Sequence, residues 1–240
     1  MQDESFYFQG IILPERAQLT FSFEMDFSTK DILEPMRMKV NIINNQLAVW
    51  IDSSLHWNIF DLKNIVNNLV KSHLNMLGYL KGYAYDLEIT RVINRRKQID
   101  YVFGIEIPCL EERGKDVNLE IEIPYLREKI SGEIGKYINR CLNDLVSAMK
   151  HADDTGFYCY RAIESLKHHC SVIQNISKGN KSDQWKKFRE ISNTSFEDIK
   201  KLKIAADPLR HGEPKDMTSD DRAILFLTTW TIVDNYLKNI

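Results

Sequence analysis

Arg210 and His211 stand together in a polar turn between two segments with helical periodicity. Proline lacks an amide hydrogen and disfavours helical geometry in the residue before it, so Pro208 predicts that the preceding helix stops before Asp207. Gly212 permits a left-handed backbone after the pair. An Arg side chain stays protonated and matches phosphate in shape, and an imidazole titrates near about pH 6.5. The turn therefore predicts a site where Arg210 binds a phosphate and His211 transfers a proton.

The same turn also has a purely structural interpretation. Asp207 can pair with Arg210 across the turn, His211 can cap carbonyls at the helix end, and Gly212 can close the turn. The residues alone leave the two interpretations equally open.

A polar helical face earlier in the chain offers supporting groups. Arg161, Glu164 and His168 fall within one narrow sector of a helical wheel. The opposite side is an apolar stripe of Cys159, Ile163, Leu166 and Cys170. One hypothesis joins the polar face to Arg210 and His211 in a single groove. The other, which the spacing favours, is a solvated face with pairs at i,i+3 and i,i+4.

A basic segment lies between these two regions. Lys186, Lys187 and Arg189 alternate with Trp185 and Phe188, a pattern that can follow an RNA backbone and stack a base. The aromatic residues are three apart, which favours core contacts of a short helix with the lysines on its wet face.

The spacing of cysteine and histidine residues does not indicate a metal or cofactor site. The four cysteines contain no Cys-x-x-Cys pair, and His168-His169-Cys170 lacks the spacing of zinc ligands. We therefore expect reduced, core-facing thiols, no metal and no cofactor. The chain shows neither a signal peptide nor a long apolar span, which predicts a cytoplasmic protein without membrane association.

Composition indicates two domains. The chain has 240 residues, of which 43% are hydrophobic, with a net charge of −2. Acidic residues outnumber basic ones in residues 1–124, and the reverse holds in residues 125–240. We therefore place a domain boundary near Pro124-Tyr125 and expect an anionic partner for the second domain.

Residues 1–124 are predicted to form an α+β domain with a mostly antiparallel sheet and one long helix. Residues 19–27 alternate between apolar and polar types, and residues 36–43 and 46–51 are two strands joined by a tight turn at Asn44-Asn45. A first strand is expected within residues 4–13, further strands at about 83–93, 99–107 and 117–123, and the long helix at about 59–80. Residues 4–10 also resemble a viral protease site used in expression tags, although their aromatic residues suit a first strand.

Residues 125–240 are predicted to form an all-α bundle of four main helices and one short one. The expected ranges are about 130–151, 157–177, 185–191, 195–206 and 218–237. Ser195 with Asp198, and Thr218 with Asp221, have the spacing of capping boxes and mark two helix starts.

The second half resembles the HEPN domains. The resemblance rests on a helix with the sequence Tyr160-Arg161-Ala162-Ile163-Glu164-Ser165-Leu166 and on the Arg-His-Gly turn between two later helices. Many HEPN domains are metal-independent ribonucleases of toxin and defence systems, and others are inactive binding or dimerisation modules. The resemblance implies an RNA-directed activity with Arg210 and His211 as catalytic residues and Arg161, Glu164, His168 and Asp207 in support.

The family ribonucleases carry an Arg, usually followed by a polar residue, and a His after four to six intervening residues. Here His211 is the polar follower of Arg210, and no second His occurs before Asp220. If His211 is instead the terminal His, the expected Arg position falls on residues 204–206, which hold Ile, Ala and Ala. A complete site would then need a second subunit. The alternative function is a non-catalytic module that dimerises or binds a partner protein.

Overall fold

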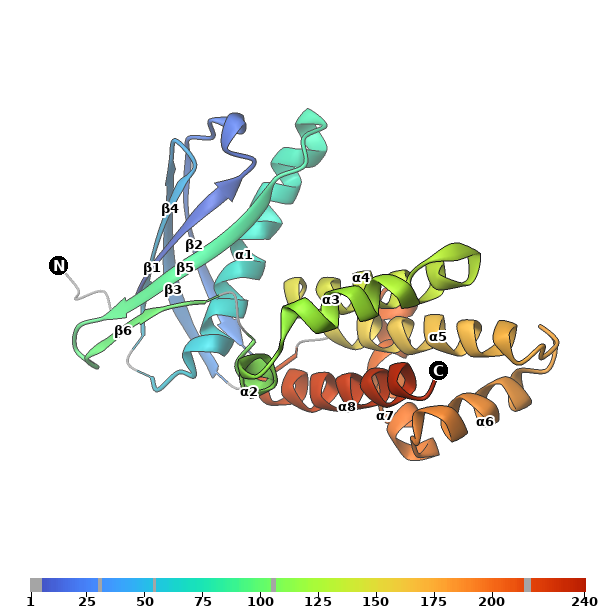
Figure 1. The fold of residues 1–240 in the computed structure, drawn as a ribbon. Coiled ribbons are helices and arrows are strands. Elements are labelled where there is room, and N and C mark those ends of the chain that lie inside the picture. The colour runs from blue at the N-terminus through green and yellow to red at the C-terminus, as the bar shows by residue number, and fades with distance from the viewer. Residues whose placement is uncertain (1–5, 30–31, 54, 105–106, 214–216) are drawn as a thin grey trace. The chain divides into compact units, whose positions relative to one another are not determined.

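The structure is a computed structural model that describes residues 6–29, 32–53, 55–104, 107–213 and 217–240. The chain divides into two compact units, Met1–Ile105 and Glu106–Ile240. The first combines a sheet with one long helix and the second is helical (Figure 1), so the predicted α+β class is confirmed. Three predicted segments lie partly outside the described residues. They are the protease-like stretch at residues 4–5, the predicted strand 99–107 at residues 105–106, and the segment between the last two predicted helices at residues 214–216.

The first unit is built on a six-stranded sheet of order β2-β3-β4-β1-β5-β6, in which every neighbouring pair is antiparallel. Its strands are β1 (Phe6–Leu13), β2 (Phe21–Thr29), β3 (Ile32–Ile43), β4 (Gln46–Asp52), β5 (Asp86–Asn94) and β6 (Ile99–Val102). A short 3-10 helix, η1 (Glu15–Ala17), follows β1. The mostly antiparallel sheet expected from the alternating residues is therefore present.

The β3–β4 hairpin turns at Asn44 and Asn45, as predicted, with φ angles of 48° and 66°. Asn tolerates this left-handed conformation better than most residues, which is why the turn forms here. The buried Asn45 side chain also donates to the carbonyl oxygens of Ile12, Pro14 and Glu15 at 3.0–3.2 Å. The hairpin is thereby joined to the segment that follows β1.

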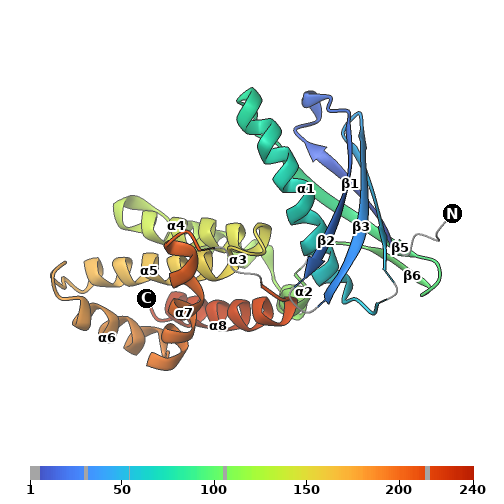
Figure 2. The same ribbon diagram turned by 180° about the vertical axis from the view of Figure 1, so that it is seen from behind.

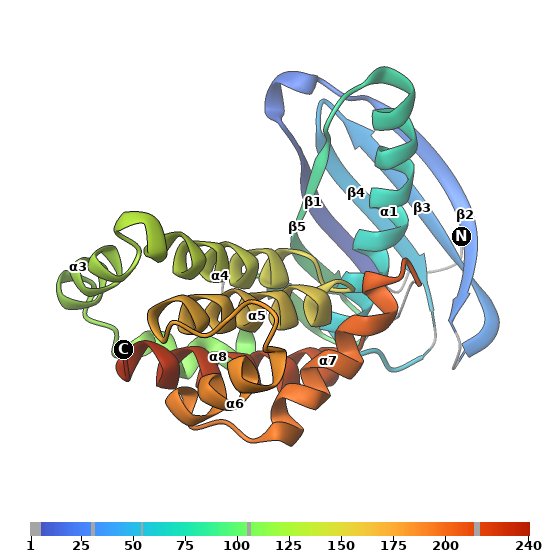
Figure 3. The same ribbon diagram turned by 90° about the vertical axis from the view of Figure 1, so that its right-hand side faces the viewer.

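Helix α1 (Ile59–Lys81) covers one face of the sheet (Figures 1 and 3). Asn58 caps its first turn by accepting from Phe60 N at 2.9 Å, and Gly82 ends it with φ of 69°. Its buried residues, Leu62, Val66, Val70 and Leu74, pack on the inward residues of the strands. The predicted amphipathic helix is confirmed, and its apolar stripe defines the inner face of the sheet.

The described part of the second unit contains a 3-10 helix and seven α-helices (Figure 2). They are η2 (Pro108–Leu110), α2 (Glu111–Lys115), α3 (Leu119–Lys129), α4 (Gly132–Lys150), α5 (Thr155–Ile173), α6 (Lys181–Ser192), α7 (Phe196–Arg210) and α8 (Ser219–Lys238). Helix α5 packs against α4, α6, α7 and α8, and the predicted stripe of Cys159, Ile163, Leu166 and Cys170 is fully buried in it. That stripe is the centre of the helical core.

The strand expected at 117–123 is wrong, because these residues begin α3. The Asn118 side chain accepts a hydrogen bond from Glu120 N at 3.1 Å and caps the helix. Leu119, Ile121 and Ile123, which alternate with polar residues, are all exposed, so their alternation does not mark a buried face of a sheet. A short alternation identifies a strand only where a partner strand exists, and here there is none among the described residues.

The end of α7 also differs from the prediction, because the helix continues through Pro208 to Arg210. A proline removes one amide donor, and near the end of a helix that loss affects a single carbonyl. The last turn is closed by His211 N–H donating to Asp207 O at 3.2 Å and by Glu213 N–H donating to Pro208 O at 3.0 Å. Gly212 follows with φ of 80°, as its type predicted.

The two predicted capping boxes are present. Ser195 Oγ accepts from Asp198 N at 3.1 Å, and Thr218 Oγ1 accepts from Asp221 N at 3.1 Å. Other boundaries move by a few residues: α5 spans Thr155–Ile173 and α6 begins at Lys181.

Candidate functional site

Arg210 is the last residue of α7, and His211 follows it as the capping residue. Both His211 and Gly212 are exposed, and the Arg210 side chain is about half exposed. The imidazole of His211 is therefore open to solvent, while the backbone N–H of the same residue closes the helix end.

Asp207 lies between two cations of α7. Its carboxylate is 2.7 Å from Lys203 Nζ and 3.8 Å from Arg210 Nη1. The hydrogen bond from Lys203, with smaller contributions from Arg210 and His211, lowers the pKa of Asp207. The pairing of Asp207 with Arg210 that the structural interpretation expected is present, although all three side chains are exposed enough for solvent to screen it.

The guanidinium of Arg210 also rests on an aromatic ring of another helix. Its central carbon lies 5.7 Å from the centroid of the Tyr160 ring on α5. Tyr160 in turn stacks on Trp185 of α6, with ring centroids 6.1 Å apart and an interplanar angle of 23°. A second cation, Lys167 of α5, lies 4.9 Å from the centroid of Trp185. Residues from three helices therefore form one group, Tyr160, Lys167, Trp185 and Arg210, which we call the cation–aromatic cluster.

Lys167 is the unusual member of the cluster. The side chain is buried, and within the described ranges no carboxylate forms an ion pair with it. Burial lowers the pKa of its ammonium, the charges of Lys181 and Arg210 act in the same direction, and Glu164 opposes them. Burial likewise raises the pKa of Tyr160 to about 12. The cluster thus contains a buried cation, Lys167, whose charged form a bound anion would stabilise.

The three residues of the polar face predicted on α5 have different surroundings: one lies beside the cation–aromatic cluster and two contact α4. Glu164 acts on the charges of Tyr160 and Lys167, so it lies beside the cluster. Arg161 instead donates to Asp144 of α4, and the His168 ring lies 6.3 Å from that of Tyr137, also on α4. The structure therefore leaves Glu164 beside Tyr160 and Lys167 and directs Arg161 and His168 toward α4.

The basic residues of α6 are mostly engaged on their own surface. Lys187 pairs with Glu190 at 3.1 Å, and the Arg189 guanidinium lies 5.7 Å from the Phe196 ring. Lys186 is exposed. Phe188 is fully buried, so it is a core residue, as its spacing favoured.

Sequence reasoning missed Tyr160 and Lys167 as site residues. The available signal was their spacing, since Tyr160, Glu164 and Lys167 follow at i, i+4 and i+7 and must share one side of a helix. The spacing alone does not indicate a partner, because Arg210 is 50 positions away along the chain.

Among the described residues, no three His, Cys, Asp or Glu side chains gather in a way that could hold a metal ion. None of the helices in the same ranges has both the length and the apolar character needed to cross a bilayer.

The fold and the cluster define an α+β protein of two units whose helical unit carries a cationic site supported by aromatic rings. The chain belongs to the DUF8168 family: the model of its N-terminal domain matches residues 6–103 and that of its C-terminal domain matches residues 123–240. Both are described as domains of unknown function, and neither description names a HEPN domain. No curated protein and no solved structure matches the chain.

Proposed function

We propose that this protein acts on RNA through its helical unit, as a HEPN-like domain, with the cation–aromatic cluster and His211 as the contact site. The observation that carries the proposal is the position of Arg210 and Lys167, two cations from different helices that are held on aromatic rings. Lys167 makes no ion pair within the described ranges, so an anion of the ligand could pair with it directly. A phosphate group suits this role because guanidinium and ammonium groups are its usual protein partners.

The chemistry that fits the site is metal-independent cleavage of the RNA backbone. Such cleavage needs a base that accepts the proton of the 2′-hydroxyl and a cation that stabilises the phosphorane. His211 is exposed and its imidazole can accept a proton, and Arg210 is the adjacent cation. Neighbouring side chains at a helix end diverge, so a homodimer that sets Arg210 of one copy opposite His211 of another completes the arrangement. The resemblance to HEPN domains assigns such an enzyme to a bacterial toxin or anti-phage defence system.

A second function is favoured by a different observation. Leu119 and Ile121 are each 63% exposed on α3, and Ile123 is 48% exposed. Leu119 and Ile123 are one turn apart and share a face of this helix. Exposed apolar faces often mark protein interfaces. The alternative is therefore a non-catalytic module in which a degenerate HEPN-like domain dimerises or binds a partner protein.

The experiment is cleavage of labelled RNA in EDTA by the wild-type chain and by Arg210→Ala and His211→Ala. Lys200→Ala is the matched control, since it removes a cation of α7 that pairs with Glu197 of the same helix at 3.7 Å. We expect cleavage by the wild type and the control, and a loss of about 10²-fold or more in both site variants. A cyclic phosphate product identifies the 2′-hydroxyl as the nucleophile.

Absence of cleavage by the folded wild type rejects the ribonuclease. RNA binding that falls in Arg210→Ala and in Lys167→Met but not in Lys200→Ala would then retain the RNA-directed function without catalysis. If the wild type neither cleaves nor binds RNA, and Leu119→Asp with Ile123→Asp dissociates a dimer or complex, the interaction module is the function.

A further inference from the structure

The face of the sheet opposite α1 holds a second candidate site, independent of the proposed RNA function. The pairing registers place the outward residues of β3, β4 and β1 in rows across the sheet. Lys39, Trp50 and Tyr7 form one row, Asn41, Ala48 and Gln9 the next, and Ile43, Gln46 and Ile11 the third. The middle of this grid is occupied by Ala48, the smallest of the nine.

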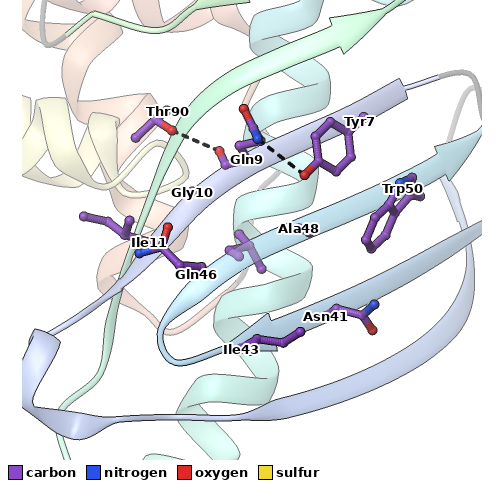
Figure 4. Close-up of a pocket in the computed structure, with 11 residues that line it drawn as sticks. Tyr7, Gln9, Gly10, Ile11, Asn41, Ile43, Gln46, Ala48, Trp50 and Thr90 are labelled. Carbon is purple, nitrogen blue, oxygen red and sulfur yellow. Dashed lines mark hydrogen bonds between the residues drawn. The ribbon is translucent and has the colours of Figure 1, made fainter.

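A hollow of about 360 Å³ lies over Ala48 (Figure 4). It exists because a methyl group is surrounded on four sides by long side chains: Trp50 and Gln46 along the same strand, and Asn41 and Gln9 on the neighbouring strands. Its volume is within the range of roughly 300–1,000 Å³ that small-molecule sites occupy. The hollow is thus set by sheet register and by one small residue.

The lining of the hollow combines an aromatic platform with side-chain amides. Tyr7 and Trp50 lie side by side across β1 and β4, with ring centroids 5.2 Å apart. Gln9, Asn41 and Gln46 surround the floor, and Gln9 Nε2 donates to Tyr7 Oη at 3.4 Å. An amide offers both donors and an acceptor, as a hydroxyl group does. A ligand with an apolar ring face and hydroxyl groups at its edge matches both parts.

The charge of the lining favours an uncharged ligand over a phosphate-bearing one. None of the residues that line the hollow is an acid or a base of the Asp, Glu, Lys or Arg type. Of the cations on the outer face, Arg91 donates to both carboxylate oxygens of Asp100 at 2.8 and 2.6 Å. Lys39 lies 3.9 Å from Glu24, a carboxylate that it shares with Arg37. A polyanion would therefore find no cation among the residues that line the hollow.

We propose that this hollow is a binding site for a neutral saccharide, whose pyranose ring stacks on Trp50 and Tyr7 while its hydroxyl groups bond the amides of Gln9, Asn41 and Gln46. Sugar rings present C–H groups on one face and alternating donors and acceptors around the edge. An open platform with amides at its perimeter is complementary to that arrangement. The N-terminal unit is then a recognition module for an uncharged glycan.

The test is binding of the fluorescently labelled full chain to an array of immobilised neutral oligosaccharides, followed by titration with the best of them. Two variants address the hollow: Trp50→Ala removes the platform, and Ala48→Leu fills the floor. Tyr79→Ala is the matched control, because Tyr79 is an exposed aromatic residue on α1, which covers the other face of the sheet. We expect both hollow variants to weaken binding about tenfold or more and the control to leave it unchanged.

The proposal is overturned if no neutral glycan binds the folded chain, or if Ala48→Leu binds as well as the wild type. It is also overturned if competition shows a higher affinity for a nucleoside, or if Ala48→Leu dissociates a dimer, since the hollow would then hold a base or a second copy of the chain. Circular dichroism and urea unfolding of each variant ensure that lost binding reflects the surface and not the fold.

Discussion

Arg161 of α5 donates two hydrogen bonds to the carboxylate of Asp144 on α4, from Nε at 3.0 Å and from Nη2 at 2.5 Å. The Asp144 side chain is 2% exposed, and the pair is bidentate, the geometry in which a buried ion pair is strongest. Arg161 also lies 4.8 Å from the Phe157 ring centroid. This contact holds two helices of the core together and takes Arg161 away from Arg210.

Asp144→Ala is expected to lower the free energy of unfolding by about 3 kcal/mol, because it leaves the partly buried Arg161 without its partner. The measurement is urea unfolding followed by circular dichroism. Arg140→Ala is the control, since Arg140 is 3.5 Å from the same carboxylate but 57% exposed, and its removal should cost below about 1 kcal/mol. Equal losses in the two variants would show that the buried pair does not stabilise the bundle.

Gly156→Ala is expected to destabilise the helical unit by about 1–3 kcal/mol. A Cβ atom at Gly156 would lie 2.9 Å from the carbonyl oxygen of Ala205, so α5 and α7 must move apart to admit it. Gly179→Ala is the matched control, because nothing lies within 4 Å of a Cβ atom built there. Thermal unfolding of both variants measures the loss of stability. An unchanged melting temperature for Gly156→Ala would contradict the close packing of α5 and α7.

Stability is expected to fall as pH decreases below about 6.5, partly through His169. This buried residue lies 2.8 Å from Tyr236 Oη, and burial lowers its pKa from the ordinary value of 6.5, with a smaller contribution from Lys129. The unfolded chain therefore binds a proton at a pH where the folded chain does not, and the difference favours unfolding until the pH passes the lowered pKa. Burial lowers the pKa of His168 in the same direction.

The measurement is the free energy of unfolding between about pH 7.5 and about pH 5. His169→Gln should lose less stability over this range than the wild type, and the exposed His56→Gln should behave like the wild type. An identical pH dependence in His169→Gln and the wild type would exclude His169 as a source of the acid sensitivity.

Thiol modification of the native chain at about pH 8 is expected to reach Cys109 first. Cys141, Cys159 and Cys170 are fully buried, and burial raises the pKa of Cys159 to about 12 and that of Cys170 to about 11. Cys109 is only partly buried. Reaction with a chromogenic disulfide should therefore show one fast thiol, which Cys109→Ser removes, and three that react after unfolding. Fast labelling of Cys159 in the native state would contradict the core packing.

Local sequence was sufficient to determine most of the elements. The positive φ angles at Asn44 and Asn45, the capping hydrogen bonds of Ser195 and Thr218, and the buried stripe of α5 all follow from residue types within a few positions of one another. Each depends on a short-range steric preference, a side-chain cap or a period of 3.6 residues, and these act before any long-range contact forms. The α+β class could be predicted for this reason.

Tertiary structure decided where local signals were ambiguous and which side chains meet. The alternating residues 117–123 are compatible with a strand and with a helix, and the structure contains the helix α3. Pro208 is compatible with the last turn of α7. The partners of Arg161 and Arg210 come from other helices, and the hollow over Ala48 exists only because strand register sets Gln9 and Asn41 on either side. Such contacts depend on packing between segments distant in sequence, which the spacing of residues along one chain segment does not encode.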